Sequence, residues 1–146
     1  MPVIRETLFN KSQTGKRMHK IIYDFYGDLG DMAKWPIQKF FDYVKNIPYQ
    51  RDKHGTEIIA RPRILISEFF QMDCKKKAIL ISSWLRANKI PYRLLAVSEI
   101  PSGRIHHVFP QGYFGDKWEN VDATYSKFYL FQKKPKLTKV EILRGD

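Results

Sequence analysis

The chain of 146 residues carries 26 Lys and Arg against 15 Asp and Glu, a formal net charge of +11, and one cysteine. Its length and its 43% hydrophobic residues predict one globular domain over residues 1–146 and exclude a disordered chain. A lone cysteine excludes an intrachain disulfide and a multi-cysteine zinc site. Since the sequence has no signal-peptide run and no stretch near the ~18 apolar residues of a membrane span, we expect a cytoplasmic protein without membrane contact.

The positive charge leaves two interpretations open. A field of this size attracts nucleic acid, an acidic cell-wall polymer or a negatively charged protein shell. The same charge also fits a soluble protein with a solvated basic face. Net charge bears on partners and not on fold, so a polyanion contact through the basic surface stays open.

The first half of the chain predicts helices joined by polar segments, after a lead-in over residues 1–30. Four apolar residues at i, i+3, i+4 and i+7 form one stripe of a helix that carries Pro36 in its first turn, namely Ile37, Phe40, Phe41 and Val44. The expected elements are a strand within 3–9, a polar basic loop over 12–20, a helix over 32–46, a strand over 57–60 and a helix over 64–70.

The second half predicts one long helix and then a run of antiparallel strands. The helix covers 74–88, and turns rich in Gly, Pro and Ser separate the segments after it. The expected strands are 92–98, 104–110, 117–123 and 137–143. Helices followed by a sheet indicate the α+β class.

The only cysteine lies where the long helix begins. Asp73 is a good N-cap residue, so the helix starts at Cys74. The thiol then shares the inward face with Ala78, Ile81 and Leu85, while the lysines at 75–77 fan away from it. Cations in a first turn oppose the helix dipole at about 0.3 to 1 kcal/mol each, but they favour a thiolate. Lysines that cost helix stability but favour a thiolate at this position indicate a chemical role for the thiol.

A nucleophilic cysteine needs a general base and a group that orients the base. The segment 104–110 offers two histidines and 117–123 offers an aspartate, in the order Cys, His, Asp. Taken singly, each residue has an ordinary structural explanation, as a core cysteine, a satisfied histidine or a turn aspartate. The same holds for the tryptophans and remaining histidines: we expect Trp84 and Trp118 to be packing residues, and His19 and His54 to be surface residues in polar loops.

Several motifs in this order resemble the transglutaminase-like superfamily, whose core is papain-like. They are "DCKKKAILISSWLRANKIPYRLLAV", "HHVF", "KWENVDATY" and, upstream, "FFDYVKNIPYQRD". The resemblance is strongest over 38–125 and is to the single-domain bacterial or phage type. There are three departures from the family pattern: Met72 replaces Gly, Asn88 and Lys89 replace the usual helix end, and Ala123 replaces Pro. The resemblance implies a nucleophile helix packed against an antiparallel sheet.

Carried over by position, the resemblance implies Cys74 as nucleophile, His107 as base and Asp122 as orienting acid. His107 is preferred over His106 because "HVF" at 107–109 fits the family order, and neighbouring strand residues face opposite ways. It also implies an oxyanion hole built from the Cys74 backbone N–H and one side chain. The candidates for that side chain are Trp35, Gln38, Tyr49 and Gln71.

The implied activity is a cysteine protease, amidase or transglutaminase-like acyltransferase that works through a thioester. Its substrate would be a protein or peptide, and we favour hydrolysis. No cofactor is expected, and no ligand spacing predicts a metal site. Bacteria and bacteriophages both encode compact proteins of this kind, which leaves a peptidoglycan peptide and a virion open as substrate and setting. The alternative is a non-enzymatic basic module for nucleic acid or an acidic scaffold.

Overall fold

The computed structural model describes residues 4–6, 11–53 and 57–145, with side chains from Gln13 onward. The helical elements are α1 (Lys11–Phe25), the 3₁₀ helix η1 (Tyr26–Lys34), α2 (Ile37–Lys45), α3 (Pro62–Glu68) and α4 (Cys74–Ala87). The strands are β1 (Ile4–Glu6), β2 (Glu57–Ile59), β3 (Tyr92–Ser98), β4 (His107–Phe114), β5 (Lys117–Asn120) and β6 (Lys139–Leu143). His54 lies outside the described residues.

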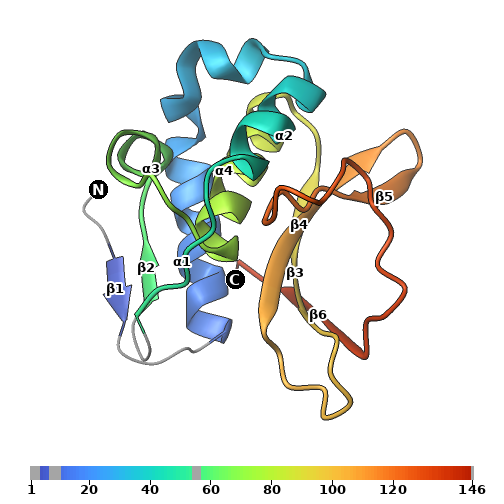
Figure 1. Cartoon of the computed structure of the whole chain (residues 1–146). Coiled ribbons are helices and arrows are strands. Elements are labelled where there is room, and N and C mark those ends of the chain that lie inside the picture. The colour runs from blue at the N-terminus through green and yellow to red at the C-terminus, as the bar shows by residue number, and fades with distance from the viewer. Residues whose placement is uncertain (1–3, 7–10, 54–56, 146) are drawn as a thin grey trace.

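The molecule has a helical side and a sheet side, as Figure 1 shows. Four strands form an antiparallel sheet in the order β5-β4-β3-β6, while β1 and β2 pair separately among the helices. The α+β class expected from the sequence is therefore confirmed. Within the described residues, no helix is both long and apolar enough to cross a membrane.

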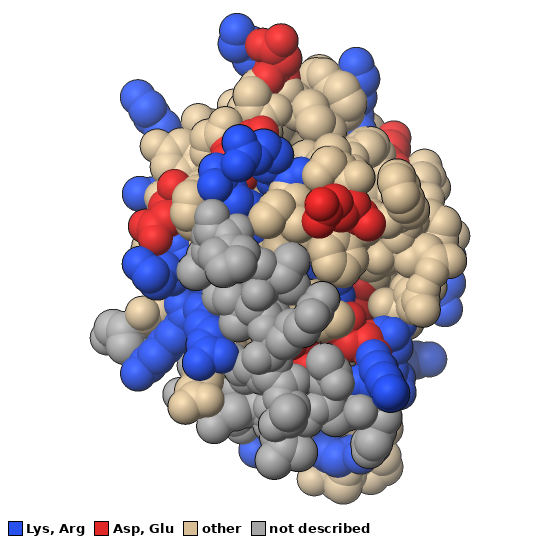
Figure 2. All heavy atoms as spheres, turned by 90° about the vertical axis from the view of Figure 1, so that its left-hand side faces the viewer, with Lys and Arg blue, Asp and Glu red and all other residues tan. Residues whose placement is uncertain are grey.

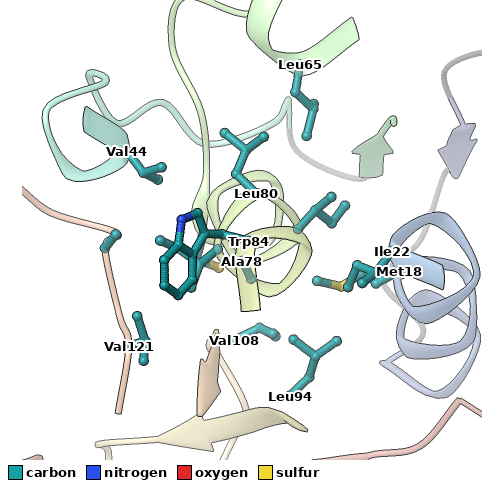
Figure 3. Close-up of a cluster of buried hydrophobic side chains, with 14 of the residues drawn as sticks. Met18, Ile22, Val44, Leu65, Ala78, Leu80, Trp84, Leu94, Val108 and Val121 are labelled. Carbon is teal, nitrogen blue, oxygen red and sulfur yellow. The ribbon is translucent and has the colours of Figure 1, made fainter. Parts of the chain in front are cut away.

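Helix α4 is the centre of the core. It packs against α1, η1 and α2 on one side and against β3 and β4 on the other, and Figure 3 shows its side chains between Met18 of α1 and Val108 of β4. The contact with β4 is close, because a Cβ added to Gly112 would lie 3.1 Å from a methyl carbon of Leu85. The predicted packing role of Trp84 is confirmed, since its ring stacks on Phe40.

Strand β3 is buried on both faces of the sheet. Leu94 and Ala96 join the main core, whereas Leu95 and Val97 form a second cluster with Phe109 and Leu137. This second cluster places the chain after β5 against the outer face of the sheet. Trp118 of β5 packs edge-on against Tyr113, as expected of a strand-packing residue.

The loop expected over 12–20 is wrong, because these residues belong to α1. The buried side chains Thr14, Met18, Ile21 and Ile22 repeat at helical spacing, but polar residues among them hide the stripe in the sequence. His19 is correspondingly not a surface residue: only 7% of it is exposed, and it bonds the hydroxyl of Tyr92 and the carbonyl of Leu143.

Other boundaries shift by a few residues. The helix expected over 32–46 is α2, which begins only at Ile37 because η1 and the residues before Pro36 occupy its first turns. Strand β4 continues to Phe114 through residues that the sequence assigned to a turn, and the turn falls at Gly115, where φ is +66°. The elements α4, β2 and β3 lie within one residue of their predicted ranges.

Candidate active site

Cys74 is the first residue of α4, as predicted. The Asp73 side chain caps the helix by accepting a hydrogen bond of 3.0 Å from the backbone N–H of Lys76. Cys74 is 6% exposed. Because the first N–H groups of a helix have no partner within the helix, the thiol lies beside free donors and the positive end of the helix dipole.

The turn before Cys74 is tied to the segment that follows α2. Met72 donates its N–H to the Pro48 carbonyl at 2.9 Å and accepts from the Gln50 N–H at 3.2 Å, so Tyr49 and Met72 pair as a parallel bridge. Met72 itself is fully buried. Two hydrogen bonds to the segment after α2 therefore hold the backbone that presents the thiol.

His107 begins β4 and faces the start of α4. Its Nε2 lies 2.7 Å from Oδ2 of Asp122, the second residue after β5, and its ring interacts with the side chain of Cys74, which helps to raise the pKa of His107. The neighbouring His106 turns the other way, and its Nε2 accepts from the backbone N–H of Glu99. The structure thus brings the three sequence-predicted residues together, and their catalytic role stays a prediction.

The charges of this cluster are strongly coupled. Burial lowers the pKa of His107, but its hydrogen bonds to Asp122 and Cys74 and their negative charges outweigh burial and raise the pKa well above 6.5. Burial raises the pKa of Asp122, but His107 and Lys134 together lower it below its usual range. The contacts of this cluster therefore favour the charged forms of both His107 and Asp122.

Two further residues hold Asp122, and sequence reasoning missed both. The hydroxyl and the backbone N–H of Thr124 donate to Oδ1 at 2.5 and 3.1 Å. Lys134 reaches the other oxygen, with Nζ 2.8 Å from Oδ2, and its side chain is only 7% exposed. Lys134 thus shares one carboxylate oxygen with His107. Thr124 stood in the quoted "DATY" motif, but nothing in the sequence around Lys134 pointed to this contact.

The expectation that the three lysines at 75–77 fan away from the fold is wrong. Lys76 and Lys77 are at most 2% exposed, and Lys75 is largely buried. Lys76 binds Asp52 at 2.5 Å, whereas Lys77 donates to the backbone carbonyls of Ile47 and Thr124. Each ammonium meets acceptors inside the fold, which offsets the cost of burying it.

Lys75 retains an electrostatic link to the thiol. Burial opposes its charge, but the negative charges of Cys74, Asp73 and Glu57 raise the pKa of Lys75. Its Nζ lies 3.2 Å from Glu57 and 3.3 Å from Asp73. Lys75 therefore interacts electrostatically with Cys74, and its support of a thiolate stays a prediction.

One acidic cluster among the described residues has the spacing of a metal site. The ligand atoms of Asp52, Glu57 and Asp73 lie within 4.8 Å of one another. The ammonium groups of Lys75 and Lys76 already contact these carboxylates. The cluster is therefore neutralised by lysines, and we assign no metal to it.

Of the four candidates for the side-chain donor of an oxyanion hole, Tyr49 lies in the turn next to the thiol. It hydrogen-bonds to Tyr125, and their rings are 4.8 Å apart. Burial, Tyr49 and the negative charge of Cys74 raise the pKa of Tyr125 to about 12. Gln38 instead donates to Asp42 on the exposed face of α2.

The other two candidates have different surroundings. Trp35 packs against Phe40 and Tyr43, and Gln71 is exposed. Tyr125 thus interacts electrostatically with Cys74, and Tyr49 is held beside the nucleophile turn by its backbone bridge to Met72.

Comparisons with known proteins add little to this geometry. The sequence matches no protein-family profile and no curated protein. A search of solved structures finds similarity to a "putative cysteine protease" from Cytophaga hutchinsonii, with 20% sequence identity and a TM-score of 0.44. The match covers 80% of this chain but 39% of that protein, so this chain spans about two fifths of its length. The functional argument therefore rests on the site itself.

Proposed function

We propose that the protein is a cysteine-dependent hydrolase of amide or peptide bonds that works through a thioester acyl-enzyme. The observation that carries the proposal is the position of His107, a largely buried histidine whose Nε2 lies 2.7 Å from the Asp122 carboxylate and whose ring interacts with the Cys74 side chain. A thiol at a helix N-terminus beside an oriented imidazole is the arrangement that nucleophilic cysteines require.

Each residue has one task in the proposed reaction. The sulfur of Cys74 attacks the carbonyl carbon, and the thiol proton resides on His107. The C–N bond breaks, the amine leaves with the proton from His107, and a thioester forms. Water then attacks the thioester, gives a proton to His107 and releases the acid, which restores the thiol. An amine in place of water would make the same site an acyltransferase.

Asp122 orients the base, and Tyr49 is our choice for the side-chain oxyanion donor. The bond from Nε2 to Asp122 leaves Nδ1 of His107 as the nitrogen for the thiol. Tyr49 is supported by the backbone bridge to Met72, because that bridge fixes its position relative to the nucleophile turn. A protein or peptide is the substrate class in this proposal, and a cell-wall peptide is one member of it.

The first test measures thiol reactivity and needs no substrate. Iodoacetamide should alkylate Cys74 at about pH 6 at least tenfold faster than it alkylates a free cysteine, whose pKa near 8.5 leaves little thiolate. His107→Ala should remove this advantage, whereas His106→Ala is the matched control and should keep most of it. A rate that follows an ordinary thiol in the folded wild-type protein contradicts the proposal.

The second test uses amide turnover. Cys74→Ala should abolish hydrolysis of a peptide amide, and Asp122→Asn should lower it by about a hundredfold or more, because an amide can hold the wrong tautomer of His107. Mass spectrometry of the wild-type protein with an activated ester should detect a thioester on Cys74. Full activity in Asp122→Asn would assign orientation of the base to another group.

A further inference from the structure

A pocket lies at the opposite end of α4 from the thiol. Its volume is about 480 Å³, and its lining residues come from α1, η1, the end of α4 and the start of β3. They are Tyr23, Tyr26, Arg86, Lys89, Ile90, Pro91 and Tyr92. Twelve residues of helix separate Arg86 from Cys74, which is about 18 Å at 1.5 Å per residue. The pocket, here called the tyrosine pocket, is distinct from the candidate active site.

The tyrosine pocket carries positive charge that no carboxylate neutralises. Its lining contains no acidic residue, and within the described part of the chain neither Arg86 nor Lys89 forms an ion pair. Both side chains are exposed. Asp24, on the same stretch of α1, is already bound to Lys20 at 2.9 Å. The two cations are therefore free to meet an anion from solution.

Lys89 occupies a backbone position that would suit glycine better. Its φ is +59°, in the left-handed region that side chains with a Cβ rarely adopt. Residues in such conformations cluster at functional sites. A lysine here places a positive charge at the rim of the tyrosine pocket despite the local strain. The end of α4 accounts for this conformation, since the N–H of Ile90 bonds the Leu85 carbonyl at 2.9 Å. The anion is indicated instead by the charges that form no ion pair among the described residues and by the aromatic walls of the pocket.

The walls of the pocket are aromatic and rigidly held. The hydroxyl of Tyr92 donates to Nδ1 of His19, because Nε2 of His19 donates to the Leu143 carbonyl. The ring of Tyr23 in turn packs edge-on against that of Tyr92, with 6.2 Å between the ring centres. The guanidinium of Arg86 lies 4.3 Å from the ring centre of Tyr23 and 5.2 Å from that of Tyr26. Stacking thus positions the Arg86 cation without using up its hydrogen-bond donors.

The tyrosine rings also offer surface to a ligand. Tyr23 is 49% exposed and Tyr26 36% exposed, although aromatic rings of this size usually find packing partners. A planar ring can stack on such a surface while a phosphate takes the donors of the neighbouring cations. The volume of the pocket lies within the range of small-molecule sites.

We propose that the tyrosine pocket binds an organic phosphate that carries a planar ring. This chemistry is that of a nucleotide, either free or as a unit of single-stranded nucleic acid. Arg86 and Lys89 hold the phosphate, and Tyr23 and Tyr26 hold the ring. The site operates independently of Cys74, so Cys74→Ala leaves binding unchanged.

The experiment titrates the full chain with three probes at low salt. The probes are adenosine monophosphate, inorganic phosphate and a short single-stranded oligonucleotide. Binding is measured by NMR shifts of the tyrosine rings or by fluorescence anisotropy. We expect both nucleotide probes to bind saturably and inorganic phosphate to bind at least tenfold more weakly. Equal affinity for adenosine monophosphate and the oligonucleotide indicates a free nucleotide as the ligand. Much tighter binding of the oligonucleotide indicates single-stranded nucleic acid. Inorganic phosphate that competes as well as the nucleotide overturns the proposal.

Variants separate this pocket from the general positive charge. Arg86→Gln should weaken nucleotide binding about tenfold, since a hydrogen-bonded charge is lost. Lys89→Gly should also weaken it while the melting temperature stays equal or rises, because glycine relieves the positive φ. Lys117→Gln removes the same charge from β5 and is the matched control. If Lys117→Gln weakens binding as much as Arg86→Gln, or if no nucleotide probe binds, the proposal is wrong.

Discussion

The two ends of α4 both carry positively charged side chains, but in opposite states. At the N-terminal end, Lys76 and Lys77 are buried and their ammonium groups are fully engaged by carboxylates or carbonyls. At the C-terminal end, Arg86 and Lys89 are exposed and form no ion pair among the described residues. One helix therefore uses lysine to join segments of the fold at one end and displays free cations at the other.

This difference shows how little a net charge of +11 says about available charge. Buried and paired lysines contribute to the sum but not to the binding of a polyanion. Figure 2 shows a face on which Lys and Arg are interspersed with Asp and Glu, which does not form a uniform basic surface. Charges must be located before they can be assigned a partner.

The largest expected effect comes from replacing a lysine at the N-terminal end of α4. Lys76→Met should lower the free energy of unfolding by about 3 kcal/mol, because it leaves the largely buried Asp52 carboxylate without its ammonium partner and Asp73 with Lys75 alone. Urea unfolding measures this value. The matched change Lys89→Met at the exposed end should stay within about 0.5 kcal/mol of wild type. Equal losses of unfolding free energy in Lys76→Met and Lys89→Met would contradict the difference between the two ends of α4.

Salt should distinguish the same two ends. Raising salt from about 50 to 200 mM should weaken binding of a single-stranded oligonucleotide about sevenfold if Arg86 and Lys89 contact two phosphates. Alkylation of Cys74 by neutral iodoacetamide should change by less than about twofold, since the charges around it are buried and poorly screened. Titration with the oligonucleotide gives the affinity at each salt concentration, and alkylation of the same protein sample gives the reaction rate of Cys74. A reactive thiol that responds to salt as strongly as the oligonucleotide would contradict the comparison.

Replacing Lys134, which is paired with Asp122, should have a smaller effect, namely on the pKa of His107. Lys134→Met removes the positive charge at Oδ2 of Asp122, which His107 also contacts. The carboxylate then acts more strongly on the imidazolium, and the pKa of His107 should rise further, by about half a unit. NMR titration of the His107 ring in Cys74→Ala protein measures it, with His106 as internal reference. Lys134→Arg should restore the wild-type value, and an unchanged His107 would make Lys134 a packing residue only.

The same variant should change acid stability in a defined direction. The folded-state pKa of Asp122 lies below its unfolded value of 3.8, so its stabilisation is present above that pH and is lost as pH falls through the folded pKa. Without Lys134 the folded pKa moves up, and the total stabilisation from Asp122 shrinks. Unfolding measured between about pH 5 and 2 should show this smaller dependence on pH.

The sequence predicted elements well where one local signal dominates. The Asp73 cap and the long apolar helix after it set α4 within one residue. The β-branched and apolar run at 92–98 gave β3. Helix α1 was not predicted. Its residues Thr14 and His19 are buried against other segments of the fold, but in the sequence alone they count as polar residues and interrupt the apolar stripe. Burial of a polar side chain depends on partners that a local pattern does not contain.

For the candidate site, the resemblance located residues and the structure supplied their surroundings. Cys74, His107 and Asp122 came from ordered motifs, and the match of "HVF" at 107–109 to the family order favoured His107 over His106. Lys134 and the burial of Lys76 could not be predicted, since their partners lie far away in sequence. Their assignment needs tertiary contacts, which single-sequence reasoning lacks.

The bond between Lys134 and Asp122 also constrains when the site is assembled during synthesis. Cys74 is made early, but His107, Asp122 and Lys134 belong to the sheet side and the segment that follows it. Contacts between residues so distant in sequence form late in folding. While the helical part alone has left the ribosome, the thiol has neither base nor acid. If the protein has the proposed function, Cys74 would therefore gain its base and orienting acid only after the chain has passed Lys134.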